Sequence, residues 1–60
     1  MAKRILVVDD EEDIVAVLRA RLQSAGYTVD CAYDGRDALE RINAHKPDLA
    51  ILDIMMPEIN

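Results

Sequence analysis

Two short runs of apolar residues stand out along the chain, and each is followed directly by an acid. Residues 5–8 form a continuous run rich in branched side chains, and residues 49–52 form a second one. Apolar runs of this length, without polar alternation, are typical of strands buried on both faces of a parallel sheet. Asp9 follows the first run and Asp53 the second. We therefore predict two buried strands that lead into carboxylates.

A helix is predicted between the first strand and residue 26. Apolar side chains recur there at helical spacing, at Ile14, Val17, Leu18, Leu22 and Ala25. Gly26 is a natural stop for this helix. The acids near its start favour the positive end of the helix dipole.

A further strand and a second helix fill the middle of the chain. Apolar and polar residues alternate in a half-exposed strand whose apolar positions are Tyr27, Val29 and Cys31. Asp34 is a suitable N-cap for a short helix, and Pro47 lies where that helix should end. The side chains expected to face inward are Ala38, Leu39 and Ile42.

The predicted order is strand, helix, strand, helix, strand. Alternation of this kind implies parallel strands joined by right-handed helical crossovers, so the fold class is α/β. The chain has 60 residues, which is enough for one domain. A domain of this size is marginally stable, because it buries a smaller fraction of its surface than a larger domain does.

Composition limits the partners of the chain. Twelve acids against seven Lys and Arg argue against contact with nucleic acid, which needs a basic patch. The single Cys31 and the absence of a Cys/His pattern argue against an internal disulfide and a zinc site. No apolar run approaches the ~20 residues of a membrane span, and no leader pattern precedes Asp9. We expect a cytoplasmic protein without membrane contact.

The acids after the apolar strands are the candidate chemistry. In open parallel sheets, ligands bind beyond the carboxyl ends of the strands. If the strands before Asp9 and Asp53 are neighbours, the carboxylates of Asp9, Asp10 and Asp53 crowd one small pocket. Oxygen ligands without nearby Cys or His indicate Mg²⁺ or another hard cation, and a metal beside a carboxylate fits phosphoryl transfer to it. Acids in such places are also often helix caps or solvated loop residues, the simpler reading for Glu12 and Asp13.

Four stretches of the sequence resemble the receiver domains of two-component response regulators, in the family's order and spacing. Residues 5–11 resemble the first strand and its acid pair, and residues 26–29 resemble the second strand. Residues 34–39 resemble the turn into the second helix, and residues 47–57 resemble the phosphoacceptor strand with the Met-Pro loop beyond it. The resemblance spans essentially the whole chain.

The resemblance implies particular roles for residues of the acidic pocket. Asp53 would be the phosphoacceptor and a ligand of Mg²⁺. Asp10 would bind Mg²⁺ directly, Asp9 through water, and the backbone carbonyl of Met55 would complete the protein ligands. The phosphoryl donor would be a histidine kinase or a small phosphodonor. The resemblance implies a switch in a phosphorelay and not an enzyme, with no catalytic residue beyond the pocket.

The resemblance also implies a flavodoxin-like fold with strand order two-one-three-four-five. Residues 1–60 then correspond to a truncated receiver domain, with its first three strands in the order 2-1-3 and its first two helices. The hydroxyl residue and the lysine that contact the phosphoryl group in the family have no counterpart here, so we expect impaired activity. The third strand would be an exposed apolar edge, and such an edge invites pairing with another chain. We therefore expect a homodimer through the third strand.

Other functional interpretations stay open. One is an engineered or excised half-fold that assembles with itself and carries no signal. Another is a phosphatase with an aspartate nucleophile, a class that would place an acid at the position of Met55. The methionine there disfavours this enzyme, although a fold alone cannot exclude it.

Overall fold

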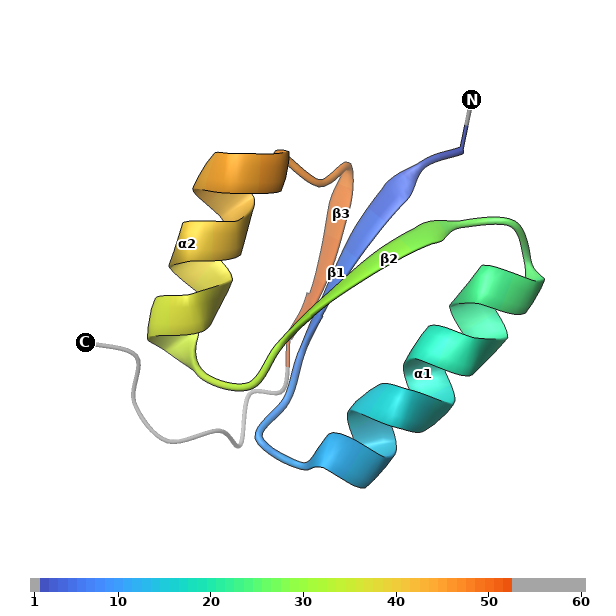
Figure 1. The fold of residues 1–60 in the computed structure, drawn as a ribbon, viewed down its shortest axis with the longest axis horizontal. Coiled ribbons are helices and arrows are strands. Elements are labelled where there is room, and N and C mark those ends of the chain that lie inside the picture. Colours follow the sequence, from blue (N-terminus) through green and yellow to red (C-terminus); the bar gives the residue numbers. More distant parts are fainter. Residues whose placement is uncertain (1, 53–60) are drawn as a thin grey trace.

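Strands and helices alternate along residues 2–52, the part of the chain that this computed structural model describes. The order of elements is the predicted one (Figure 1). The elements are β1 (Arg4–Val8), α1 (Glu12–Ser24), β2 (Thr28–Ala32), α2 (Gly35–His45) and β3 (Leu49–Leu52). Within the described residues, neither helix is long and apolar enough to cross a membrane.

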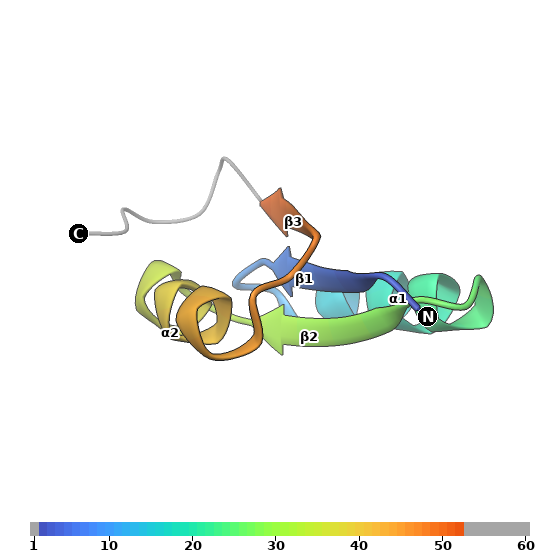
Figure 2. The same cartoon turned by 90° about the horizontal axis from the view of Figure 1, so that it is seen from above.

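The three strands form one parallel sheet in the order β2-β1-β3. Val8 at the end of β1 lies opposite Ala32 of β2 and Leu52 of β3, so the strands end level with one another. Seen from above, α1 and α2 lie on opposite faces of the sheet (Figure 2). The strand order confirms the predicted flavodoxin-like arrangement of a receiver domain.

β1 is the centre of the core. Its four apolar residues are 0–4% exposed, because a strand lies on each side of it and a helix covers each face. Leu6 and Val8 pack with Ala38 of α2, whereas Ile5 and Val7 pack with Val15 of α1. The continuous apolar run is thus explained by burial on both faces, as predicted.

Local backbone chemistry sets the ends of α1. Acids occupy its first turn, where they complement the positive end of the helix dipole. The helix ends before Gly26, whose φ is 98°, a conformation that glycine adopts without steric cost. The Gly26 N–H donates to the Gln23 carbonyl at 3.0 Å, so Gly26 is the stop that the sequence predicts.

α2 begins at the predicted cap. Asp34 has extended backbone angles, and its Oδ1 accepts a hydrogen bond from the Asp37 N–H at 2.7 Å. The helix ends at His45, and the next residue, Lys46, takes the left-handed conformation directly before Pro47. Both ends of α2 therefore agree with the sequence prediction.

Two predictions of burial are wrong for the described chain. Leu39 and Ile42 were expected to face inward, yet they are 55% and 38% exposed. The apolar run of β3 was expected to be buried on both faces, yet Leu49 and Leu52 are 56% and 54% exposed. The reason is shared: within residues 2–52 both helices lie against β1 and β2, and neither lies close to β3. The other expectation, drawn from the family's strand order, was an apolar third strand with exposed side chains, and Leu49 and Leu52 agree with it within residues 2–52.

Candidate functional site at the carboxyl edge of the sheet

The carboxyl ends of β1 and β3 lie side by side. Val8 and Leu52 are paired across the two strands, so the chain leaves the sheet at the same level in both. Asp9 follows β1, and Asp53 is the next residue of the sequence after β3. Asp53 and Met55 lie outside the described residues, so their predicted roles stay predictions. The predicted adjacency of the two strands is confirmed.

Asp9 is a buried carboxylate that belongs to the backbone framework of this edge. Its side chain is mostly covered, with 8% of the residue exposed. Its N–H donates to the Ala32 carbonyl at 3.2 Å, which extends the β1–β2 ladder by one residue. Its Oδ1 accepts a hydrogen bond from the Glu11 N–H at 2.9 Å. One carboxylate oxygen of Asp9 is thus used to fix the loop between β1 and α1.

Asp10 differs from Asp9 in its surroundings. It is exposed at the bend between β1 and α1. Within residues 2–52, no hydrogen bond or ion pair engages its carboxylate. The two neighbouring acids therefore differ in what their carboxylates contact. Asp9 accepts a hydrogen bond that holds the loop, whereas the carboxylate of Asp10 is exposed to solvent.

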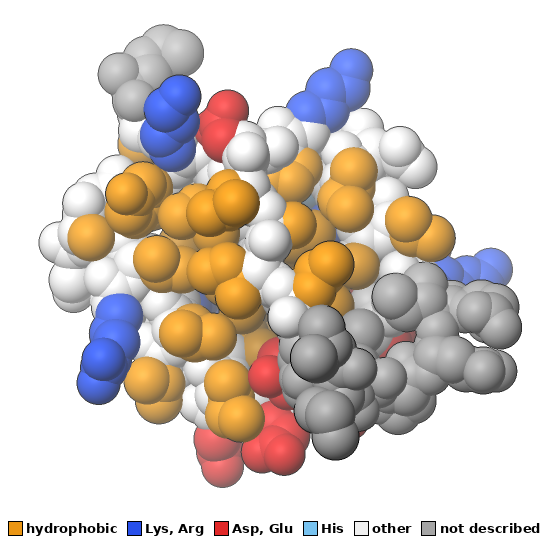
Figure 3. Space-filling view, turned by 180° about the vertical axis from the view of Figure 1, so that it is seen from behind, with side chains coloured by type: hydrophobic (Ala, Val, Ile, Leu, Met, Phe, Trp, Pro, Cys, Tyr) orange, Lys and Arg blue, Asp and Glu red, His pale blue; other side chains and the backbone are white. Residues whose placement is uncertain are grey.

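Negative charge is concentrated where β1 leads into α1. Residues 9–13 are all acids, and a group of Asp and Glu side chains is visible at one end of the molecule (Figure 3). Like charges this close repel one another, and the positive end of the α1 dipole offsets only part of that repulsion. A cation bound at this edge would relieve it further.

The donors present fit a hard cation in type. Asp9 and Asp10 offer carboxylate oxygens, and Mg²⁺ typically uses one or two carboxylates together with several waters. Among the described residues, however, no group of three or more His, Cys, Asp or Glu side chains is arranged to hold a metal. A complete site would need donors from beyond Leu52, as the sequence prediction requires.

A polar network at the opposite, amino edge of the sheet was missed by the sequence analysis. The Arg4 guanidinium donates from Nη1 to His45 Nδ1 at 3.1 Å and lies 3.8 Å from Asp30 Oδ2. The Arg4 N–H donates to Asp48 Oδ2 at 2.8 Å, and the Asp48 N–H returns a bond to the Arg4 carbonyl at 2.7 Å. These contacts tie β1 to β2, to the end of α2 and to the start of β3. Sequence spacing gives no signal for these contacts, because they form only where each helical crossover brings the chain back to the amino edge of the sheet.

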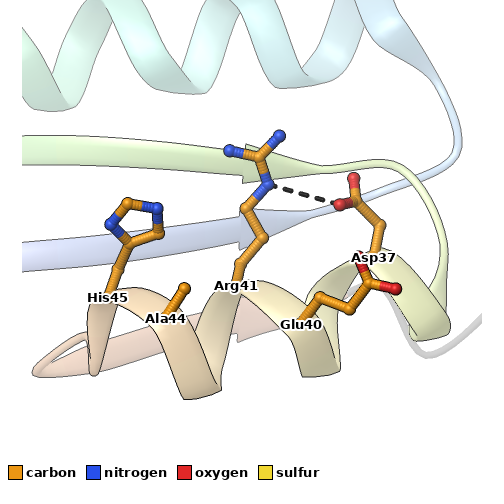
Figure 4. Close-up of a pocket in the computed structure, with 5 residues that line it drawn as sticks. All are labelled: Asp37, Glu40, Arg41, Ala44 and His45. Carbon is orange, nitrogen blue, oxygen red and sulfur yellow. Dashed lines mark hydrogen bonds and ion pairs between the residues drawn. The ribbon is translucent and has the colours of Figure 1, made fainter.

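A shallow hollow on α2 does not coincide with the predicted site. It has a volume of about 210 Å³, and all of its lining residues come from one helix (Figure 4). They are Asp37, Glu40, Arg41, Ala44 and His45. Arg41 Nε lies 3.3 Å from Asp37 Oδ1, so the charges that line the hollow partly satisfy one another. None of the acids at the end of β1 contributes to it.

Comparison with known proteins identifies relatives of the whole chain. Residues 5–60 match the family described as the response regulator receiver domain. The chain is also similar to the alkaline phosphatase synthesis transcriptional regulatory protein PhoP of Bacillus subtilis (strain 168), with 50% identity over 60 residues. That similarity covers 100% of this chain and 25% of the relative, so the chain spans a quarter of the relative's length.

Proposed function

The chain belongs to the response regulator receiver domain family, and on that premise we propose that it is a phospho-acceptor module of a two-component phosphorelay. Asp53 is the residue that receives the phosphoryl group. The observation that carries the proposal is the pairing of β1 with β3, whose ends are level at Val8 and Leu52. Both strands lead directly into acids in the sequence, and in parallel sheets the carboxyl edge is where ligands bind.

The proposed reaction is transfer to a carboxylate. An oxygen of Asp53 attacks the phosphorus of the donor, which is the phosphohistidine of a histidine kinase or a small phosphodonor such as acetyl phosphate. A new O–P bond forms while the bond from phosphorus to the donor breaks, and the donor leaves with the bonding electron pair. The product is an acyl phosphate on Asp53. Such aspartyl phosphates are established covalent intermediates.

The chain's own acids would prepare the site for this step. We propose that Asp10 and Asp53 bind Mg²⁺ directly, that Asp9 binds it through water, and that the Met55 carbonyl completes the protein ligands. Bound Mg²⁺ would neutralise charge that develops on the phosphoryl group. Two observations support these different roles. Asp10 is exposed, and within residues 2–52 its carboxylate has no partner. Asp9 is buried and already accepts the Glu11 N–H. The latter suits an indirect role.

Treatment with acetyl phosphate tests the proposed acceptor. The parent chain, Asp53→Asn and Asp13→Asn are incubated with acetyl phosphate and Mg²⁺, and intact mass is followed with time. Asp13 is the matched control, an acid in the first turn of α1. We expect one phosphoryl group on the parent and on Asp13→Asn, and none on Asp53→Asn. Undiminished labelling of Asp53→Asn would contradict the proposal.

Self-association through β3 is the second part of the proposal. Within residues 2–52, β3 pairs with β1 on one side only, and its apolar side chains Leu49 and Leu52 are exposed. An exposed strand edge of this kind is a template for pairing with another chain. We propose a homodimer through β3. A monodisperse monomer in sedimentation at micromolar concentration would contradict it.

The observation of an open edge also favours a second candidate function, in which the chain assembles with itself and carries no signal. The acetyl phosphate experiment separates the two, because a purely structural assembly takes no phosphoryl group. In either case we place the module in the cytoplasm. We propose no direct contact of this segment with nucleic acid, since acids outnumber Lys and Arg by twelve to seven.

A further inference from the structure

Arg4 lies at the amino edge of the sheet, where β2 and the end of α2 come close to the start of β1. Its side chain is on the face of β1 that α2 covers, since Leu6, two residues further on, packs with Ala38 of α2. Its guanidinium reaches His45, the last residue of α2, and Asp30 of β2. These three side chains belong to β1, α2 and β2, so none of them lies at the outer edge of β3.

The contact between Arg4 and His45 specifies the protonation of the imidazole. Arg4 Nη1 lies 3.1 Å from His45 Nδ1. A guanidinium has donors only and keeps its charge in proteins, so Nδ1 accepts this hydrogen bond through a free lone pair. His45 is therefore neutral in this arrangement, with its proton on Nε2. Arg4 Nη1 also donates to the His45 carbonyl at 3.4 Å, one of the carbonyls that a helix leaves without a partner at its end.

Protonation of His45 makes this contact unfavourable. An imidazolium carries N–H donors at both nitrogens, so Nδ1 would present a donor and a positive charge to the Arg4 guanidinium. Imidazole is the side chain that ordinarily changes charge between about pH 5 and about pH 8, and His45 is the single histidine of the chain. A fall in pH through this range therefore acts on the contact through one group.

Other charged groups belong to the elements that meet at this edge. They are Arg4 of β1, Asp30 of β2, Asp37, Glu40 and Arg41 of α2, and Lys46 and Asp48 of the turn into β3. Arg41 leaves α2 on the same side as His45 (Figure 4), but its Nε lies 3.3 Å from Asp37 Oδ1. Asp48 Oδ2 accepts the Arg4 N–H at 2.8 Å. Within residues 2–52, no carboxylate forms an ion pair with the His45 ring, so none would offset the repulsion between a charged imidazole and Arg4.

Asp30 offers the guanidinium a second position. Asp30 Oδ2 is buried and has no hydrogen-bond partner within the described residues. Arg4 Nε lies 3.8 Å from this oxygen, which is close enough for an ion pair but too far for a hydrogen bond. A buried oxygen without a partner is unfavourable. A small movement of the guanidinium towards β2 would supply the missing bond.

We infer that Arg4 is a pH-sensitive switch at the end of α2. While His45 is neutral, Arg4 holds the end of α2 against β1. When His45 takes up a proton, the guanidinium leaves the ring and bonds to Asp30 Oδ2. The imidazolium then turns to solvent at the end of the helix, where a positive charge is favoured. The start of β3 stays attached, because the Arg4 backbone makes the bonds to Asp48.

This switch goes beyond the function proposed above, since it depends neither on phosphoryl transfer to Asp53 nor on self-association. It makes the attachment of α2 to the sheet respond to pH. Loss of the contact frees the last residue of the helix from β1, whereas the pairing of the three strands is unchanged.

Nuclear magnetic resonance of the ¹⁵N-labelled chain tests this switch, because the single imidazole and the Arg4 Nε–H give separate signals. Spectra are recorded between about pH 8 and about pH 5.5, where imidazole changes charge and carboxyl groups ordinarily remain ionised. We expect the Arg4 Nε–H signal to move with the same midpoint as the His45 ring. An Arg4 signal that stays fixed while the ring titrates would overturn the inference. A neutral ring that carries its proton on Nδ1 would also overturn it.

Asp30→Asn and His45→Gln are the matched variants. Asparagine keeps the shape of Asp30 but removes the charge to which Arg4 moves, so the ring should still titrate while the Arg4 response becomes several-fold smaller. A response caused only by the electric field of the charged ring would persist in this variant. Glutamine at position 45 can accept from Arg4 but takes up no proton, so the Arg4 signal should stay constant.

Far-UV circular dichroism at both ends of the pH range checks that each variant is folded. An Arg4 response as large as that of the parent, in either folded variant, would overturn the inference. The parent spectra decide the question by themselves if a variant does not fold, because a fixed Arg4 signal there already contradicts the switch.

Discussion

At the scale of single residues, Lys46 holds a backbone conformation that usually belongs to glycine. Its φ and ψ are 49° and 64°, and its N–H donates to the Ile42 carbonyl at 2.9 Å. This geometry closes α2 and turns the chain towards β3. A residue with a Cβ in the left-handed region carries a steric cost of roughly 1–2 kcal/mol, which the surrounding structure must offset.

Lys46→Gly should therefore raise the free energy of unfolding by about 0.5–1 kcal/mol, net of the extra flexibility of glycine in the unfolded chain. Gly26→Ala is the matched opposite change, because Gly26 has a φ of 98° and no atom lies within 4 Å of a Cβ built there. The loss of stability caused by Gly26→Ala would come from the strained backbone conformation alone. Urea titrations followed by circular dichroism measure both. A Lys46→Gly variant less stable than the parent would contradict this account of the turn.

Asp34 makes a second prediction at the residue scale. Its carboxylate satisfies one of the free N–H groups at the start of α2, through the 2.7 Å bond from Asp37. Asp34→Ala should destabilise the chain by about 1 kcal/mol, whereas Asp34→Ser, which can still cap, should cost much less. The same urea titrations report this difference. Equal effects of alanine and serine would show that the cap contributes little.

Short-range chemistry of this kind could be predicted from the sequence. The cap at Asp34, the stop at Gly26 and the helix end before Pro47 each follow from a few adjacent residues. The contact of Arg4 with His45 could not, because the two residues are 41 positions apart and meet only through the return of α2 to the sheet. The conformation of Lys46 was also missed, since nothing about lysine favours it.

At the scale of elements, two similar apolar runs differ in burial. Residues 5–8 are buried in β1, whereas Leu49 and Leu52 of β3 are exposed. The hydrophobic pattern alone predicts the same burial for both runs, and it identified both as strands. It was wrong about the environment of β3 because burial depends on the elements that pack against a strand, and within residues 2–52 neither helix lies close to β3.

Truncation of one leucine in each strand measures this difference. Leu6 is fully buried between β2, β3 and the face covered by α2, so Leu6→Ala should cost about 2–5 kcal/mol. For a domain this small, such a loss should abolish cooperative folding. Leu49→Ala, the matched change at an exposed site, should cost less than about 1 kcal/mol in the monomer. Thermal melts at low concentration compare the two, and a similar loss from both would contradict the assignment of β1 as the core.

At the scale of the whole molecule, the sheet brings the carboxyl ends of two strands that are distant in the sequence, β1 and β3, to one edge. The sequence alone placed Asp9 and Asp10 after the first strand, but it left open whether the strand before Asp53 lies next to it. The resemblance to receiver domains implied the order 2-1-3, and the structure confirms it. The positions of Asp53 and Met55 fall outside the described residues, so this half of the site rests on prediction and on family membership.

The central claim is that the edge formed by β1 and β3 assembles one cation site from Asp10 and Asp53. A far-UV circular dichroism melt of the parent, Asp10→Asn and Asp53→Asn, with and without millimolar Mg²⁺, tests it most directly. A ligand that binds only the folded state raises the melting temperature. We predict that Mg²⁺ stabilises the parent and that either substitution largely removes this stabilisation, while raising the midpoint without Mg²⁺ by relieving repulsion. An equal Mg²⁺ effect on all three proteins, or none on the parent, would contradict the claim.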